Sequence, residues 1–125
     1  MARAPISAPE SRAAGDFAPL RSSFVRHLRA ENKSPSTVVT YTKAIDQLAA
    51  FLASSGMPTA VSAVTREHVE AFLISRQVQG FRPATVAQRI RSLQQFFRWL
   101  RDEGEIRESP MHNMRARRRP RPRSR

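Results

Sequence analysis

Residues 82–104 read RPATVAQRIRSLQQFFRWLRDEG, and their pattern sets the class of fold. Large apolar residues recur at spacings of four and three, which is the period of one face of an α-helix. These residues are Val86, Ile90, Leu93, Phe97 and Leu100. Proline is favoured in the first turn of a helix and glycine just beyond the last turn. The sequence therefore predicts a helix from Arg82-Pro83 to Gly104.

Three earlier segments repeat the helical spacing, and none alternates in the way that a pair of strands requires. They cover residues 17–31, 34–56 and 65–80. Ser34 and Thr65 are predicted N-caps, because their hydroxyl oxygens can accept hydrogen bonds from free backbone N–H groups. Residues 57–64 are predicted to form a connector that contains Pro58. The expected fold class is all-α, a compact four-helix bundle.

The distribution of charge divides the chain into a body and a tail. Its 125 residues include 22 basic and 10 acidic ones, which gives a formal charge of +12. Seven arginines lie in residues 112–125, where there is no acid. We predict a flexible, disordered leader at 1–16, a folded domain at 17–111, and a basic disordered tail or truncated linker at 112–125. The body is itself moderately basic, which favours a polyanion such as nucleic acid as partner.

The sequence lacks the residues that several classes of function require. Without cysteine there is no disulfide, no thiol nucleophile and no cysteine-bound zinc. The three histidines are scattered, so we expect no catalytic residue, no metal, no cofactor and no small-molecule substrate. The His-x-x-Arg pattern at 112–115 is treated as coincidence, since no tyrosine follows it. No apolar run reaches the roughly 18 residues of a membrane span, and no signal-peptide core is present. We therefore expect a soluble intracellular protein.

Two of the predicted helices have outer faces that suit DNA. Opposite the apolar stripe of the second helix are Ser36, Thr40, Lys43, Gln47 and Ala50. The fourth helix has Arg82, Thr85, Arg89 and Ser92 along one flank, Arg91, Arg98 and Arg101 along another, and Gln88 between them. Short hydroxyl side chains allow close approach to phosphates, and the major groove admits one α-helix. The same residues also suit an ordinary solvated surface. Tyr41 is expected in the core, and Trp99 beside it or against a neighbouring domain.

Several segments resemble the N-terminal core-binding domain of tyrosine recombinases, which include phage integrases and Xer-like enzymes. The run SPSTVVTY at 34–41, followed by Phe51-Leu52, is similar to the second helix of that domain. Thr85, IRSL at 90–93, FFRWL at 96–100 and Gly104 are similar to its last helix. Ile106 and SPM at 109–111 are similar to its exit into the catalytic domain. The resemblance covers about residues 17 to 111.

The resemblance implies a SAM-like domain that forms half of a C-shaped clamp around double-stranded DNA, with its second and fourth helices facing the major groove. Carried over, the contacts would be Ser36, Thr37, Thr40 and Lys43 on the second helix, and Thr85, Arg89 and Arg91 on the fourth. Arg82 and the tail are expected to add phosphate contacts. Of these, Thr40, Thr85 and Arg89 are the predicted readers of base edges. The resemblance also implies a cytoplasmic, nucleoid-associated protein of prokaryotic type that takes part in DNA integration and recombination.

Catalysis is not expected of these residues. The chemistry of the family uses a tyrosine nucleophile in a C-terminal domain, whereas the only tyrosine here is Tyr41, on a predicted core stripe. We therefore expect a truncated integrase, a frameshifted remnant or an isolated domain that binds DNA without cutting it. The alternative is a protein-interaction module that oligomerises or binds a full-length recombinase, through an exposed apolar patch that includes Trp99. A helix-turn-helix repressor is disfavoured, because the connector before Thr65 is long for a tight turn.

Overall fold

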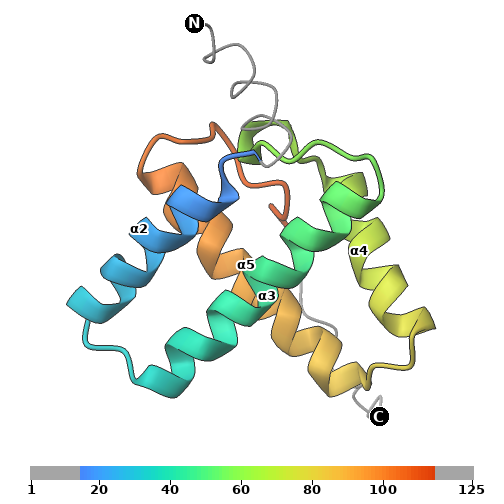
Figure 1. Cartoon of the computed structure of the whole chain (residues 1–125), viewed down its shortest axis with the longest axis horizontal. Coiled ribbons are helices and arrows are strands. Elements are labelled where there is room, and N and C mark those ends of the chain that lie inside the picture. Colours follow the sequence, from blue (N-terminus) through green and yellow to red (C-terminus); the bar gives the residue numbers. More distant parts are fainter. Residues whose placement is uncertain (1–14, 115–125) are drawn as a thin grey trace, which may run out of the picture.

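The computed structural model describes residues 15–114, and this part of the chain is helical. Its four α-helices are α2 (Phe17–Ala30), α3 (Pro35–Ser54), α4 (Arg66–Val78) and α5 (Pro83–Asp102). A single turn of 3-10 helix, η1 (Val61–Ala63), lies in the predicted connector. No strand occurs among the described residues, so the predicted all-α class with four helices is confirmed (Figure 1). The rest of the predicted leader and tail, residues 1–14 and 115–125, lies outside the described part.

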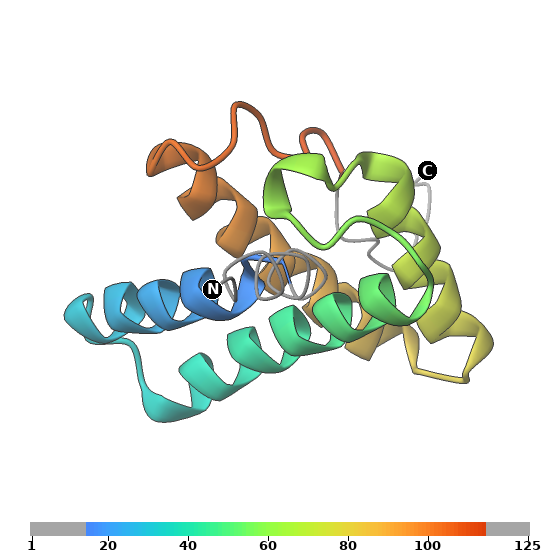
Figure 2. The same ribbon diagram turned by 45° about the horizontal axis from the view of Figure 1, so that its top comes forward.

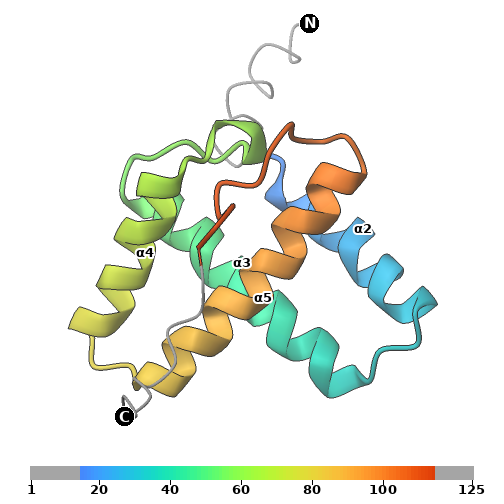
Figure 3. The ribbon, with the colours of Figure 1, turned by 180° about the vertical axis from the view of Figure 1, so that it is seen from behind.

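The two longest helices, α3 and α5, cross near their middles (Figures 1 and 3). Helix α2 packs against α3 on one side of this crossing, and α4 packs against both α3 and α5 on the other side. Figure 2 shows α2 and α3 side by side and running in opposite directions. Since α3 packs against the other three α-helices and α5 packs against α3 and α4, both bury more of their circumference than a single apolar stripe would require.

Aromatic side chains fill the core where the helices meet. The four most buried ones, each at most 2% exposed, are Phe24, Phe72, Phe96 and Phe97. Phe24 of α2 meets Phe96 of α5 edge to face, with 5.3 Å between the ring centroids. Tyr41 stacks on Phe24 at 6.0 Å, and Trp99 packs against it at 5.2 Å. The prediction that Tyr41 and Trp99 pack in or beside the core is confirmed, and aromatic pairs of this geometry add to the stability from burial.

Both predicted N-caps are confirmed. The Oγ of Ser34 accepts a hydrogen bond from the Thr37 backbone N–H at 3.2 Å, at the start of α3. The Oγ1 of Thr65 accepts from the backbone N–H of His68 at 3.4 Å, and the Nδ1 of His68 accepts from the Thr65 backbone N–H at 2.9 Å. This reciprocal capping box satisfies two N–H groups that the first turn of α4 leaves free. It gives His68 a structural role that spacing alone did not reveal.

Three of the four helices, α3, α4 and α5, end before a glycine as predicted, and α2 is the exception. Gly80, after α4, has a φ of +93°, a left-handed conformation that ends a helix and that only glycine adopts without strain. No glycine follows α2, and there Asn32 takes the left-handed conformation, with a φ of +64°. Asparagine is one of the few residues that tolerate it, because its short polar side chain bonds locally. The sequence therefore predicted the end of α2 by periodicity and not by the residue that makes the turn.

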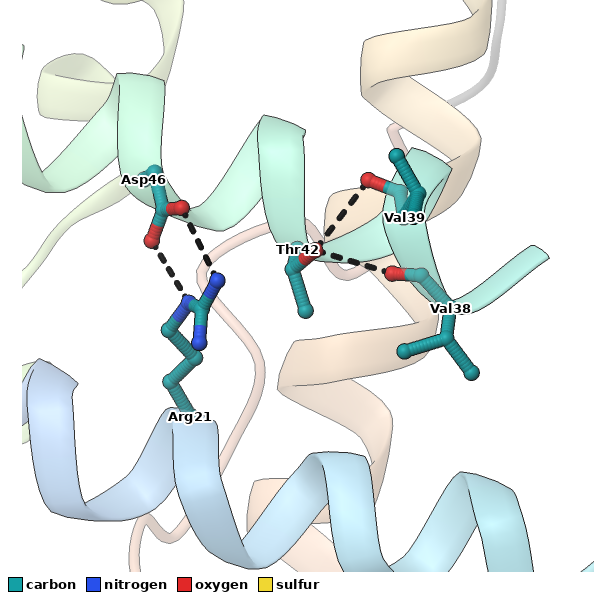
Figure 4. Close-up of polar contacts among 5 residues, drawn as sticks. All are labelled: Arg21, Val38, Val39, Thr42 and Asp46. Carbon is teal, nitrogen blue, oxygen red and sulfur yellow. Dashed lines mark hydrogen bonds and ion pairs between the residues drawn. The ribbon is translucent and has the colours of Figure 1, made fainter. Parts of the chain in front are cut away.

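Polar contacts tie α3 to α2 and satisfy a buried hydroxyl within α3 (Figure 4). The guanidinium of Arg21 donates two hydrogen bonds to the carboxylate of Asp46, at 2.7 and 3.1 Å. The buried Thr42 donates to the carbonyl oxygens of Val38 and Val39 at 2.9 and 3.1 Å, so its hydroxyl is satisfied within its own helix. The exposed acid on α3 is thus paired with a cation of α2.

After α5 the chain turns back and packs on the bundle. Ile106, Met111 and Met114 are buried, and the Gln94 side chain donates a hydrogen bond to the Met114 carbonyl oxygen. Figure 3 shows this segment, coloured red, returning across α5. The sequence placed Met114 in the tail, but it belongs to the core cluster. At the other end, Asp16 accepts a hydrogen bond from the Val61 backbone N–H at 2.9 Å and ties the start of α2 to η1.

Candidate nucleic-acid interface

The solvent face of α5 carries alternating amide and guanidinium groups. Its exposed positions, three or four residues apart, are Ala84, Gln88, Arg91, Gln95 and Arg98. Neither Arg91 nor Arg98 has a carboxylate within ion-pair distance in residues 15–114. Guanidinium groups free of acidic partners can bind phosphate oxygens, and amides can reach the edges of bases. This face is therefore chemically suited to a nucleic acid.

The matching face of α3 is small, polar and basic. Ser36 and Lys43 are exposed, while Thr40 and Gln47 are half-buried along the edge nearest α5. No acidic group pairs with Lys43 among the described residues. The nearby Asp46 is exposed but bound to Arg21, so its negative charge is compensated where it would otherwise repel a polyanion.

An open depression of about 560 Å³ separates the N-terminal half of α3 from the middle of α5. We call it the α3–α5 groove. Ser36, Thr37 and Thr40 line it on the α3 side, and Gln88, Arg91 and Gln95 on the α5 side. No acidic residue is among its lining residues. A shallow, polar, acid-free surface of this kind suits an extended polyanion better than a small apolar ligand.

The prediction that Arg89 and Ser92 face outward is wrong. Arg89 is 5% exposed and Ser92 is 1% exposed, because this flank of α5 packs into the crossing with α3. The Nε of Arg89 donates to the Oε1 of Gln47 at 2.8 Å, and its Nη1 donates to the Oε1 of Gln88 at 3.1 Å. The sequence analysis assigned this flank to solvent because its residues are polar, although Arg89, three residues after Val86 and four before Leu93, adjoins the apolar stripe. Contacts inside the protein satisfy the Arg89 side chain.

In the described residues, Arg89 has another arginine near it but no carboxylate within ion-pair distance. Burial lowers the pKa of the Arg89 guanidinium, and the positive charge of Arg76 lowers it further. Arg76, near the end of α4, lies over the rings of Phe72 and Phe81, 5.1 and 5.3 Å from their centroids. The buried Nε of Arg76 has no hydrogen-bond partner in the part of the chain that the structure describes. In the described residues the two guanidiniums thus contact neutral amide and hydroxyl oxygens and aromatic rings, and neither has a carboxylate within ion-pair distance.

The other predicted contact residues divide into two groups. Ser36, Thr37, Thr40 and Arg91 come together in the α3–α5 groove. The hydroxyls of Thr37 and Thr40 are also engaged locally: Ser34 donates to the former at 3.0 Å, and the latter donates to the Ser36 carbonyl oxygen at 3.0 Å.

The second group lies outside the lining of the groove. Lys43 is exposed farther along α3, and Arg82 and Thr85 lie at the start of α5, the first exposed and the second half-buried. Gln95, which the sequence analysis did not single out, lines the groove. The sequence could have identified Gln95, because this residue continues the spacing of Gln88 and Arg91 opposite the apolar stripe.

Neither a metal-binding cluster nor a membrane-spanning helix is present in residues 15–114. These residues contain no group of three or more His, Cys, Asp or Glu side chains arranged to hold a metal ion. None of the four α-helices combines the length and the apolar character that crossing a membrane would require.

Comparison with known proteins shows which proteins the sequence is similar to. The family described as phage integrase, N-terminal SAM-like domain, matches residues 20–104. Tyrosine recombinase XerC of Salmonella typhi is 30% identical over 101 residues, and that of Chlorobaculum tepidum is 34% identical over 113 residues. These alignments cover 80% and 84% of this chain, but 33% and 34% of the relatives. The chain thus spans about a third of the length of the curated relatives it matches. No solved structure matches it significantly.

Proposed function

The chain belongs to the phage integrase N-terminal SAM-like domains of the tyrosine recombinase family, and from this we propose that it binds double-stranded DNA through the α3–α5 groove and the faces beside it. The observation that carries the proposal is the absence of acid from the groove, together with cations on both of its sides that have no acidic partner in the described residues. Such cations bind DNA phosphates regardless of base sequence, and this contact brings α3 and α5 within reach of the base edges.

The proposed DNA contacts are assigned from the exposure of each side chain and from whether it lines the α3–α5 groove. Lys43, Arg82, Arg91 and Arg98 are exposed, and we assign them to phosphates. Ser36, Thr37, Thr40, Gln88 and Gln95 line the groove between these cations, and we assign them to base edges or sugars. Thr85 was predicted to read a base edge, but since it is half-buried at the start of α5, we assign it to the DNA backbone instead. We do not retain a direct base contact for the buried Arg89.

We further propose that these residues bind DNA without cutting it, as part of DNA integration and recombination. A tyrosine nucleophile needs several cationic and proton-transferring groups around the phosphate, whereas Tyr41, which lines the groove and stacks on Phe24, has one arginine and no lysine or histidine beside it in that lining. The relatives that bear the name tyrosine recombinase are about three times as long as the aligned region. Other recombinase protomers are the second partner that we propose.

The test is fluorescence anisotropy with a mixed-sequence DNA duplex across a salt series. The triple variant Lys43→Ala, Arg91→Ala, Arg98→Ala should bind more weakly, and the slope of log K against log salt should fall by about one for each phosphate that is no longer neutralised. The matched control is Arg26→Ala, which removes one exposed charge from α2 outside the groove. Equal slopes for the wild type and the triple variant would remove this face from the interface.

A second function, protein interaction, is favoured by one observation on α4. Ile74 and Val78, one turn apart, are 57% and 80% exposed. Trp99, which the sequence analysis placed in such a patch, instead packs against Phe24. Exposed aliphatic pairs of this kind can form part of a contact between proteins. Light scattering at rising protein concentration tests the idea, since Ile74→Lys with Val78→Lys should abolish any self-association that the wild type displays.

A further inference from the structure

A three-residue hydrogen-bond cluster links the two helices that form the proposed DNA-binding face. It consists of Arg89 on α5, Gln47 on α3 and Gln88, the residue before Arg89. Arg89 is buried, whereas Gln47 is half-buried and Gln88 is exposed and lines the α3–α5 groove. A buried guanidinium therefore holds two amides, one of which reaches the surface of the groove.

The chemistry of arginine fixes which way these amides point. A guanidinium group has five N–H donors and no acceptor, so only the oxygen of an amide can face it. The distances to Arg89 are 2.8 Å from the Oε1 of Gln47 and 3.1 Å from the Oε1 of Gln88. Rotation of either amide by half a turn would place its own NH₂ group against the cation. No carboxylate in residues 15–114 pairs with Arg89 and could take over as acceptor.

The orientation of the amide determines which base edge a glutamine can contact. A glutamine that is free to turn reads adenine with both its oxygen and its nitrogen, as acceptor from N6 and donor to N7. A glutamine whose oxygen is held from behind presents its NH₂ donors instead. Guanine offers two acceptors in the major groove, N7 and O6, whereas adenine offers one acceptor, N7, beside the N6 donor.

We propose that Arg89 is a positioning residue, which, itself fixed by Gln47, holds Gln88 as a hydrogen-bond donor and thereby directs the groove toward guanine rather than adenine edges. The proposal rests on the proposed function, DNA binding by this face. Gln95 provides the contrast, because it lines the same groove but makes no hydrogen bond with another described residue. Its amide is free to turn, so it should tolerate either purine.

The experiment begins with the duplex that the full chain enriches most strongly from a random-sequence library. In a second copy of this duplex every guanine is replaced by 7-deazaguanine, which lacks the N7 acceptor but pairs normally with cytosine. The wild type should bind the second copy about tenfold more weakly, which is the usual effect of removing one hydrogen bond to a base. Arg89→Met should reduce this discrimination to about twofold or less and should enrich adenine in a new selection. Arg89→Lys, which keeps a donor at the site, should restore part of it.

Two glutamine variants serve as a matched pair and also guard against a misfolded Arg89 variant. Gln88→Met should lose the sensitivity to 7-deazaguanine, whereas Gln95→Met should keep it. In double-mutant cycles, Arg89→Met should be non-additive with Gln88→Met and additive with Gln95→Met. Equal discrimination by the wild type, Arg89→Met and Gln88→Met would overturn the positioning role and leave DNA binding intact. A wild type that binds no duplex even at low salt would overturn both the proposed function and this inference.

Discussion

Replacement of Arg89 by methionine removes a buried charge while keeping an unbranched side chain of similar reach. In the wild type this guanidinium is 5% exposed and donates two hydrogen bonds, both to neutral amide oxygens. Hydrogen bonds to a charged group contribute about 1.5 to 3 kcal/mol each, so these two favour the folded state by about 3 to 6 kcal/mol. Removal of the cation from water costs several kcal/mol, and the charge of Arg76 adds to that cost.

The favourable hydrogen bonds and the unfavourable burial of the charge are of similar size. The sign of the stability change therefore depends on what happens to Gln47 and Gln88 when Arg89 is replaced. Gln88 is exposed and Gln47 is half-buried, so both amides can turn to water once Arg89 is gone, and no buried acceptor is orphaned. We therefore expect Arg89→Met to raise the free energy of unfolding by about 0 to 2 kcal/mol. Arg89→Ala also loses about three buried methylene groups, at about 0.8 kcal/mol each, and should be about 2 kcal/mol less stable than Arg89→Met.

The assay is urea denaturation followed by circular dichroism at 222 nm, a wavelength that reports on helix. The lowered pKa of Arg89 means that the folded state disfavours its charged form. The stability lost in this way would be regained only as the pH rises through the titration of arginine, far above neutrality. The difference between wild type and Arg89→Met should therefore be constant from about pH 5 to 9. If Arg89→Met were less stable than the wild type beyond experimental error, the hydrogen bonds would outweigh the cost of burial and the reasoning would be refuted.

Two further substitutions test the capping box and the paired acid. Thr65→Ala should lower the free energy of unfolding by about 1 kcal/mol, because it leaves the His68 backbone N–H without its cap; a urea melt unchanged within error would count against the capping box. Asp46→Asn should cost about 0.2 to 1 kcal/mol through the loss of its exposed ion pair with Arg21, and it should tighten duplex binding because α3 loses its exposed negative charge. Anisotropy titrations measure the second effect, and weaker binding by Asp46→Asn would contradict the placement of DNA on α3.

The helical pattern made most of the fold predictable. Apolar residues at spacings of three and four identified every α-helix, and Ser34 and Thr65 marked two of the starts correctly. These signals are local, since a helix forms its hydrogen bonds within one segment and its caps lie next to it in sequence. The DNA contacts carried over from the family resemblance stay a prediction, with Ser36, Thr40 and Arg91 gathered in one groove.

The local pattern did not predict how much of the surface of each helix is covered by the other helices. Arg89 and Ser92 were assigned to solvent because they are polar, yet the crossing of α3 and α5 buries both. That burial depends on where two segments more than forty residues apart in sequence come together, as the bond from Arg89 to Gln47 records. The sequence thus determined which residues are helical and which face is apolar. The packing of the helices decided which polar residues remain free to meet a partner, because exposure is a property of the assembled bundle and not of any one helix.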